Sequence, residues 1–211
     1  MNVATPYSAV APTIEGEVLI VLARSSGVMT GRHVATLVKR GSQSAVNQAL
    51  ERLVAQGLVL RESAGRAYLY RLNRDHLAFP AVHALESMRG VLLERLRATL
   101  SSWAAESGDC APVHGSLFGS TARGDGDGDS DIDLFVVRPD ATTADDPTWL
   151  KHIDQLRAAV ASWTGNQASI VEIALTDCAT LRTDNPHVVQ EMERDGILLA
   201  GTPLSELLGA R

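Results

Sequence analysis

The sequence predicts an α+β fold with two modules, on the basis of helix periodicity, strand periodicity and charge. Residues 14–57 contain three helix candidates, each with an apolar stripe, and two β-rich segments follow within residues 58–72. Residues 113–199 then alternate β-rich and helical segments. Residues 14–76 hold nine Lys/Arg and five Asp/Glu (9 − 5 = +4), whereas residues 77–211 hold ten and twenty (10 − 20 = −10). This asymmetry predicts modules with different partners.

These observations divide the chain into a front module at residues 14–76, a linking helix at residues 77–107 and a mixed α/β module at residues 108–211. No apolar run approaches ~18 residues, so we expect no membrane partner. The first residues lack a basic region followed by an apolar core, so we expect no secretory signal. Cys110 and Cys178 lack paired-cysteine spacing, and we expect free thiols in a reducing cytoplasm.

The front module has the pattern of a winged helix-turn-helix. After a first helix from Ile14, Thr30 and Ser42 are suited to cap a second and a third helix, and Gly57 ends the third. Two β-rich segments, residues 58–61 and 67–72, follow across a glycine-containing turn. Three helices and such a hairpin make a winged helix-turn-helix, in which the third helix enters the DNA major groove.

Polar residues on the third predicted helix suit duplex DNA as a partner. Amide and guanidinium side chains hydrogen-bond base edges, and hydroxyl groups reach phosphates. The segment resembles small bacterial winged-helix regulators, and arginines on the hairpin are positioned to meet phosphates. The alternative is a solvated helix face on a module that binds protein or dimerises. The expected DNA-binding residues are Gln43, Ser44, Asn47, Gln48, Arg52 and Arg66, with Arg61 and Arg71 as further phosphate contacts.

The linking segment predicts one long amphipathic helix after Pro80. Apolar residues recur at three- and four-residue steps from Val82 to Trp103. A helix of ~24 residues would be about 36 Å long. Its stripe either packs on one of the modules or meets a second copy of the chain, so a homodimer is an open alternative.

The stretch from Leu117 to Val137 carries the chemistry. Asp131 and Asp133 lie two residues apart in a β-rich segment, so they share one face about 7 Å apart. Paired carboxylates in an apolar strand repel each other and lose hydration, which favours a bound cation. Gly119-Ser120 precedes a short helix whose backbone N–H groups suit a phosphate. The stretch therefore predicts metal-dependent nucleotide chemistry.

Gly119-Ser120, ten further residues and Asp131-Ile132-Asp133 together resemble the signature of the DNA polymerase beta-type nucleotidyltransferase superfamily, especially its minimal branch. The resemblance covers residues 112–199. It implies a Mg²⁺-dependent transfer of a nucleoside monophosphate from an NTP, expected to be ATP, to a hydroxyl of a protein, RNA or small molecule. It assigns catalysis and metal binding to Asp131 and Asp133, and nucleotide binding to Gly119, Ser120 and Arg123.

The resemblance also requires a third acid on a later strand, and Glu172 is the residue that matches. It is a lone carboxylate within the apolar segment 168–175, where many family members have Asp. Glu172 is therefore expected to be catalytic, either as a ligand of a second Mg²⁺ or as the general base. The alternative is a glutamate on an edge strand that faces water.

Other motifs and one other function compete with this interpretation. A P-loop is excluded because Asp125 stands where lysine is needed. Asp125, Asp127 and Asp129 resemble the start of a calcium loop, but its turn glycine and closing glutamate are absent, which leaves an incidental Ca²⁺ site. The alternative function is a DNA-binding transcriptional regulator whose transferase-like module senses nucleotide without turnover. Glu172 favours the enzyme, because a sensor would not need it.

Overall fold

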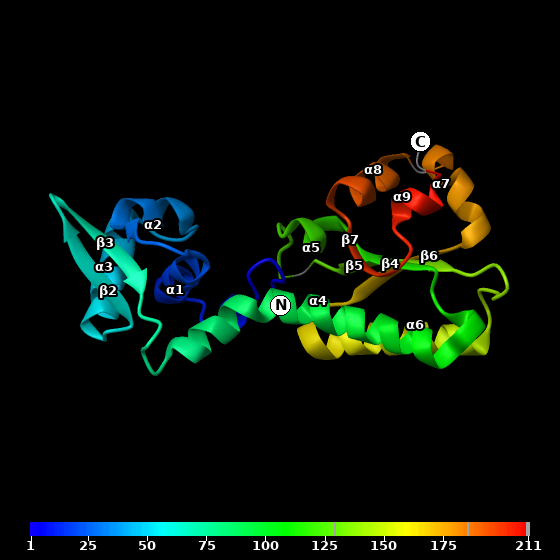
Figure 1. The fold of residues 1–211 in the computed structure, drawn as a ribbon, viewed down its shortest axis with the longest axis horizontal. Coiled ribbons are helices and arrows are strands. Elements are labelled where there is room, and N and C mark those ends of the chain that lie inside the picture. Colours follow the sequence, from blue (N-terminus) through cyan, green and yellow to red (C-terminus); the bar gives the residue numbers. More distant parts are fainter. Residues whose placement is uncertain (129, 185, 210–211) are drawn as a thin grey trace. The chain divides into compact units, whose positions relative to one another are not determined.

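The structure, a computed structural model, describes residues 1–128, 130–184 and 186–209. Asp129, the third aspartate of the calcium-like pattern, lies outside the described residues. The chain forms two compact units. The front unit is Thr5–Arg89, and the back unit combines Met1–Ala4 with Gly90–Arg211. Helix α4 (Phe79–Ser107) begins in the front unit and continues into the back unit (Figure 1).

The front unit contains three complete α-helices, the start of α4, a short 3-10 helix and a small antiparallel sheet. The expected caps are confirmed: the side chains of Thr30 and Ser42 accept hydrogen bonds from the backbone N–H groups of His33 and Ala45. The elements are η1 (Pro6–Ala9), α1 (Ile14–Arg24), β1 (Met29–Thr30), α2 (Gly31–Leu37), α3 (Gln43–Ala55), β2 (Val59–Ala64) and β3 (Ala67–Leu72).

The sheet of the front unit has the order β1-β3-β2, and all its strands are antiparallel. The β2–β3 hairpin confirms the predicted strand pair. Strand β1 is an addition that the sequence did not reveal, because two residues are too short to show a strand period. Val18, Leu50 and Tyr70 pack together in one core, which joins the helices to the sheet.

The back unit is built on a four-stranded sheet with the order β6-β5-β4-β7. Strands β5 and β6 are parallel, and the other neighbours are antiparallel. The elements are η2 (Gly108–Cys110), β4 (His114–Leu117), α5 (Gly119–Arg123), β5 (Ile132–Arg138), α6 (Pro147–Thr164), β6 (Ala168–Ala174), η3 (Leu175–Asp177), α7 (Cys178–Asp184), α8 (Pro186–Asp195), β7 (Ile197–Gly201) and α9 (Leu204–Leu207).

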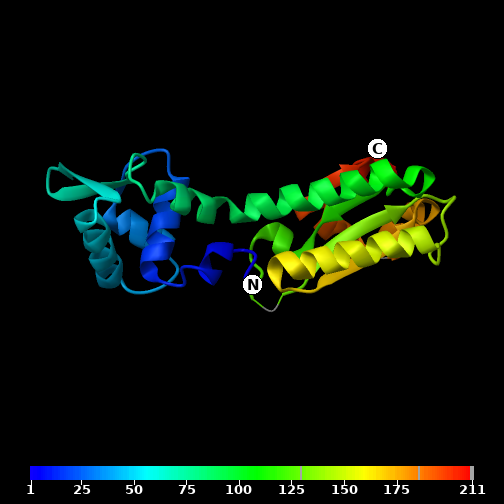
Figure 2. The same ribbon diagram turned by 90° about the horizontal axis from the view of Figure 1, so that it is seen from below.

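The two faces of this sheet carry different helices. Ile132 and Leu134 of β5 pack in one core with α4 and α6, which cover the face that Figure 2 shows. Phe135 and Val137 pack in the other core with α7, α8 and α9 (Figure 1). Because side chains alternate along a strand, Asp133 lies on the face of Phe135 and Val137. This face is called the α8 face below.

Helix α4 is 29 residues long. Its apolar stripe is buried in turn by the two units, with Val82 in the core of the front unit and Leu96 and Leu100 in that of the back unit. The sequence had suggested that one module or a second copy would cover the whole stripe. In the described part of the chain, every helix is too short or too polar to cross a membrane.

Candidate active site

The Gly119-Ser120 turn lies directly against the carboxylate of Asp133. The backbone N–H of Phe118 donates to the carbonyl oxygen of Asp133 at 3.0 Å, which holds the turn beside β5. Gly119 has φ +68°, and a Cβ atom at this position would lie 2.2 Å from Asp133 Oδ2. A Cβ atom here would force the Asp133 side chain to move, and the positive φ favours glycine at this position.

Helix α5 is fastened to the start of β5 by a second contact. The Thr121 hydroxyl donates to the carbonyl oxygen of Asp131 at 3.4 Å. At the other end of the helix, the carbonyl oxygen of Ser120 accepts from the N–H groups of Gly124 and Asp125 at 2.9 and 3.1 Å. The structure therefore brings together the turn and the acid pair that the sequence singled out.

Negative charge accumulates around Asp133. Burial of this half-buried side chain raises its pKa above the usual range, and the charge of exposed Asp131 raises it further. Arg123 lowers the pKa, and Glu191 of α8 raises it. Two carboxylates that repel each other in this way are hard oxygen donors of the kind that Mg²⁺ prefers, so these residues fit a magnesium ion.

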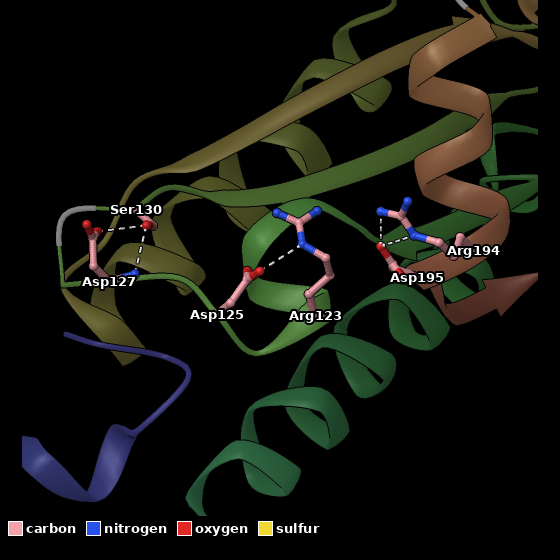
Figure 3. Close-up of polar contacts among 6 residues, drawn as sticks. All are labelled: Arg123, Asp125, Asp127, Ser130, Arg194 and Asp195. Atoms are coloured by element: carbon pink, nitrogen blue, oxygen red, sulfur yellow. Dashed lines mark hydrogen bonds and ion pairs between the residues drawn. The ribbon is translucent and has the colours of Figure 1, made fainter. Parts of the chain in front are cut away.

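Arg123 is surrounded by acids. Its Nε atom lies 3.0 Å from Asp125 Oδ2, and the adjacent Arg194–Asp195 pair is 2.7 Å long (Figure 3). The hydrogen bond from Arg123 to Asp125 is the largest influence that raises the arginine's pKa, and the charges of Glu191 and Asp195 add to it. A phosphate would therefore have to compete with Asp125 for this guanidinium.

Glu172 lies on the opposite face of the sheet, and its assignment as the third acid of this site is wrong. In the parallel register of β5 and β6, Glu172 pairs with Val136, whereas Asp133 pairs with Ser169. Paired residues of neighbouring strands share a face, so Glu172 points toward α6. There its Oε2 atom accepts a hydrogen bond of 2.7 Å from the indole N–H of buried Trp149. The lone carboxylate has a structural partner.

On the α8 face, β6 presents Ser169, Val171 and Ile173, none of which carries a carboxylate. Within the described residues, no group of three His, Cys, Asp or Glu side chains is arranged to hold a metal ion. Glu191 of α8, which the sequence did not single out, lies near enough for its charge to raise the pKa of Asp133. Its neighbourhood depends on how α8 packs beside α5, and no periodicity in the sequence reveals that packing.

The polar residues expected to contact DNA lie on the exposed side of α3. Gln43, Asn47 and Gln48 are exposed, as is Ser44. Gln43 donates to the Asn47 side chain and to the carbonyl oxygen of Gly31, each at 3.2 Å. The side chains of Gln43 and Asn47 therefore hold each other in place.

Several arginines of the front unit have acidic partners within the unit. Arg52 forms an ion pair with Glu15. Arg61 lies 2.8 Å from Glu51 and also over the ring of Tyr68, with 4.5 Å to its centroid. Arg71 pairs with Glu62 at 3.5 Å, whereas Arg66 is exposed at the tip of the hairpin. The cationic surface offered to DNA is therefore smaller than the charge count indicated.

The turn and the acid pair lie at the adjoining ends of β4 and β5. Residues 115–181 match the family model of the nucleotidyltransferase domain. The matched segment includes the turn and both aspartates. The match does not extend to the front unit. A comparison with curated proteins finds no match.

Proposed function

We propose that the back unit transfers a nucleoside monophosphate from an NTP, with ATP the expected donor, to a hydroxyl of a protein, RNA or small molecule. The observation that carries the proposal is the packing of the Asp133 carboxylate against Gly119. The acid that we propose as a metal ligand therefore lies beside the backbone that would hold the phosphates. The nucleotidyltransferase match over the same segment supports it.

Each residue of this site has a chemical task. Asp131 and Asp133 would hold Mg²⁺, which would neutralise charge that develops on the leaving pyrophosphate. The Ser120 hydroxyl and the N–H groups after Gly119 would donate hydrogen bonds to the β- and γ-phosphates. Arg123 would exchange Asp125 for a phosphate oxygen when the nucleotide binds. With Glu172 absent from this face, β6 supplies no carboxylate that a second Mg²⁺ could share with the acid pair.

Glu191 is our replacement for Glu172 as the third acid. It is exposed on α8, and its charge reaches both Asp133 and Arg123. A carboxylate near the reacting groups would take the proton from the acceptor hydroxyl as general base. Glu191→Gln should therefore reduce the transfer rate more than nucleotide affinity, whereas Glu172→Gln should leave both close to the parental values.

For the front unit we propose duplex DNA as the partner. Three helices with an antiparallel hairpin, and an exposed polar face on α3, support a winged helix-turn-helix. Asn47 and Gln48 would meet base edges, and Arg66 a phosphate. Because Arg52, Arg61 and Arg71 have acidic partners, we expect modest affinity that falls with added salt.

A second candidate function is a DNA-binding regulator whose back unit binds nucleotide without turnover. One observation favours it: β6 presents Ser169, Val171 and Ile173, and no carboxylate, beside Asp133. A sensor needs residues that bind a metal and phosphates, but it does not need a third carboxylate for catalysis. The two functions therefore differ in turnover and share nucleotide binding.

Incubation with each α-phosphate-labelled NTP, Mg²⁺ and a lysate of the source cells separates the two functions. Label transfer that is lost in Asp133→Asn supports the enzyme. Binding of a non-hydrolysable ATP analogue that requires Mg²⁺, without any label transfer, supports the sensor. An absence of both binding and transfer would refute both. Asp127→Asn is a matched control, because it removes an acid of the loop between α5 and β5 that is not assigned to the site.

A further inference from the structure

A cleft of about 320 Å³ opens on the α8 face of the sheet, beside β4 and β7. Its walls are mostly apolar: Met192 of α8, Leu198 of β7 and Leu204 of α9. His114 and Ser116 of β4 also line it. Ser116 pairs with Phe135, two residues along β5 from Asp133, so the cleft and the candidate active site share one face. The volume equals that of roughly ten water molecules.

Two buried polar side chains line this cleft and form a hydrogen-bonded chain. His114 is 2% exposed and Ser116 is 4% exposed. His114 Nδ1 lies 2.7 Å from the carbonyl oxygen of Thr202, and Nε2 lies 2.8 Å from Ser116 Oγ. A carbonyl only accepts, so Nδ1 carries the proton and Nε2 of the neutral ring accepts from the serine hydroxyl. Burial lowers the pKa of His114, which favours this neutral form.

These two hydrogen bonds determine whether Ser116 acts as a donor or an acceptor toward a ligand. Its one proton is used by His114, so its oxygen presents lone pairs to the cleft. A ligand that reaches Ser116 must therefore bring a hydrogen-bond donor. Buried acceptors of this kind, placed in a mostly apolar pocket, are typical of small-molecule sites.

The charge of the cleft excludes anions. Its lining residues include no lysine or arginine among those that the structure describes, and Glu193 contributes a carboxylate. Glu193 is paired with Arg182, so its charge is partly balanced. A phosphate-bearing ligand would meet no cationic side chain among the residues that line the cleft. A neutral ligand would lose little hydration free energy when it enters.

We propose that this cleft is a second ligand site, which binds a neutral small molecule with an apolar body and a hydroxyl group that donates to Ser116 Oγ. The nucleotide of the proposed transferase is not its ligand. The inference does not depend on nucleotide transfer, because it uses neither Asp131 nor Asp133.

The test uses three probes of similar size with the full chain, in the absence of nucleotide and metal. Benzyl alcohol carries the expected donor, toluene lacks it, and benzoate is anionic. Binding is followed by titration of the protein's NMR resonances. We expect benzyl alcohol to bind with a Kd in the millimolar range or below, more tightly than toluene, and benzoate to show no saturable binding. Ser116→Ala should weaken benzyl alcohol by about two- to tenfold, the usual effect of one neutral hydrogen bond, and leave toluene unchanged.

A blocking variant keeps the test valid if Ser116→Ala does not fold. Leu198→Trp should fill the cleft and abolish binding of benzyl alcohol. Leu150→Trp is the matched control, because Leu150 of α6 is 42% exposed and Leu198 is 39% exposed. The proposal is overturned if benzyl alcohol does not bind, if benzoate binds as well as benzyl alcohol, or if both tryptophan variants bind benzyl alcohol like the parental protein.

Discussion

Replacement of Glu172 by alanine separates a structural role for this residue from a catalytic one. The variant removes the carboxylate that accepts the hydrogen bond from Trp149 Nε1 at 2.7 Å. Trp149 is completely buried, and its ring lies 4.6 Å, centroid to centroid, from that of Trp103 in the core beneath α4. The indole N–H would therefore be left in an apolar environment without an acceptor. We expect lower stability with unchanged nucleotide binding and transfer.

The size of the effect follows from the kind of hydrogen bond. A bond to a charged group contributes about 1.5–3 kcal/mol, and a buried donor without a partner costs a similar amount. For a protein of this length each kcal/mol shifts Tm by roughly 2–4 °C, so we expect a decrease of about 3–12 °C. Glu172→Gln keeps an oxygen that can accept from the indole, so its decrease should be smaller.

Urea unfolding followed by tryptophan fluorescence measures the free energy of unfolding of the two variants. Nucleotide binding and label transfer are then measured at a temperature at which both variants are folded. An alanine variant of parental stability that has lost transfer would show that Glu172 acts in catalysis, and the face assignment drawn from the β5–β6 register would be refuted.

Three other predictions test the site, the buried histidine and the front unit. Gly119→Ala should weaken binding of a non-hydrolysable ATP analogue in calorimetry, because the added Cβ displaces the Asp133 carboxylate. Gly128→Ala is the control, since a Cβ there has open space, and it should bind the analogue like the parental protein. If the two variants bind the analogue equally well, the turn is not part of the site. Because the pKa of His114 is lowered, its contribution to stability is full above the unfolded pKa of about 6.5 and is lost as pH falls through the folded pKa. In chemical unfolding, His114→Gln should accordingly lose less stability than the parental protein as the pH falls below about 6.5, and an equal loss of stability in the two proteins would contradict this. Arg66→Glu should lower DNA affinity in gel shifts for all sequences alike; an effect on one sequence only would indicate a base contact.

Local features were predictable from the sequence because they depend on neighbours along the chain. The caps at Thr30 and Ser42 follow from side chains that bond to the backbone three residues on. The place of Asp133 in a strand follows from the strand period, whereas Asp131 comes just before Ile132, where β5 begins. The turn glycine was recognised too, although only the structure shows that the Asp133 carboxylate occupies the space of its missing side chain.

What the sequence could not reveal depends on pairing between distant segments. Glu172 matches the third acid by its sequence position, but the register of β6 against β5 places it beside Val136. A shift of one residue in that register would have reversed the result. Glu191 acts on Asp133 only because α8 packs beside α5. The pairing of Arg61 with Glu51 likewise joins a strand to a helix, so charge counting overestimated the free cations.

The division of the chain has a consequence for folding kinetics. Val3 is 3% exposed in the core of the back unit, yet residues 5–89, which separate it from the rest of that unit, form the front unit (89 − 5 + 1 = 85 residues). While the front unit is unfolded, docking of Val3 closes a loop of that length, with an entropic cost of roughly 4 kcal/mol from the length-dependent term. Once the front unit is folded, residues 5–89 are already ordered, so docking of Val3 loses much less entropy. Docking of the N-terminal arm should therefore be a late step, in which Val3→Ala speeds unfolding and leaves the folding rate nearly unchanged.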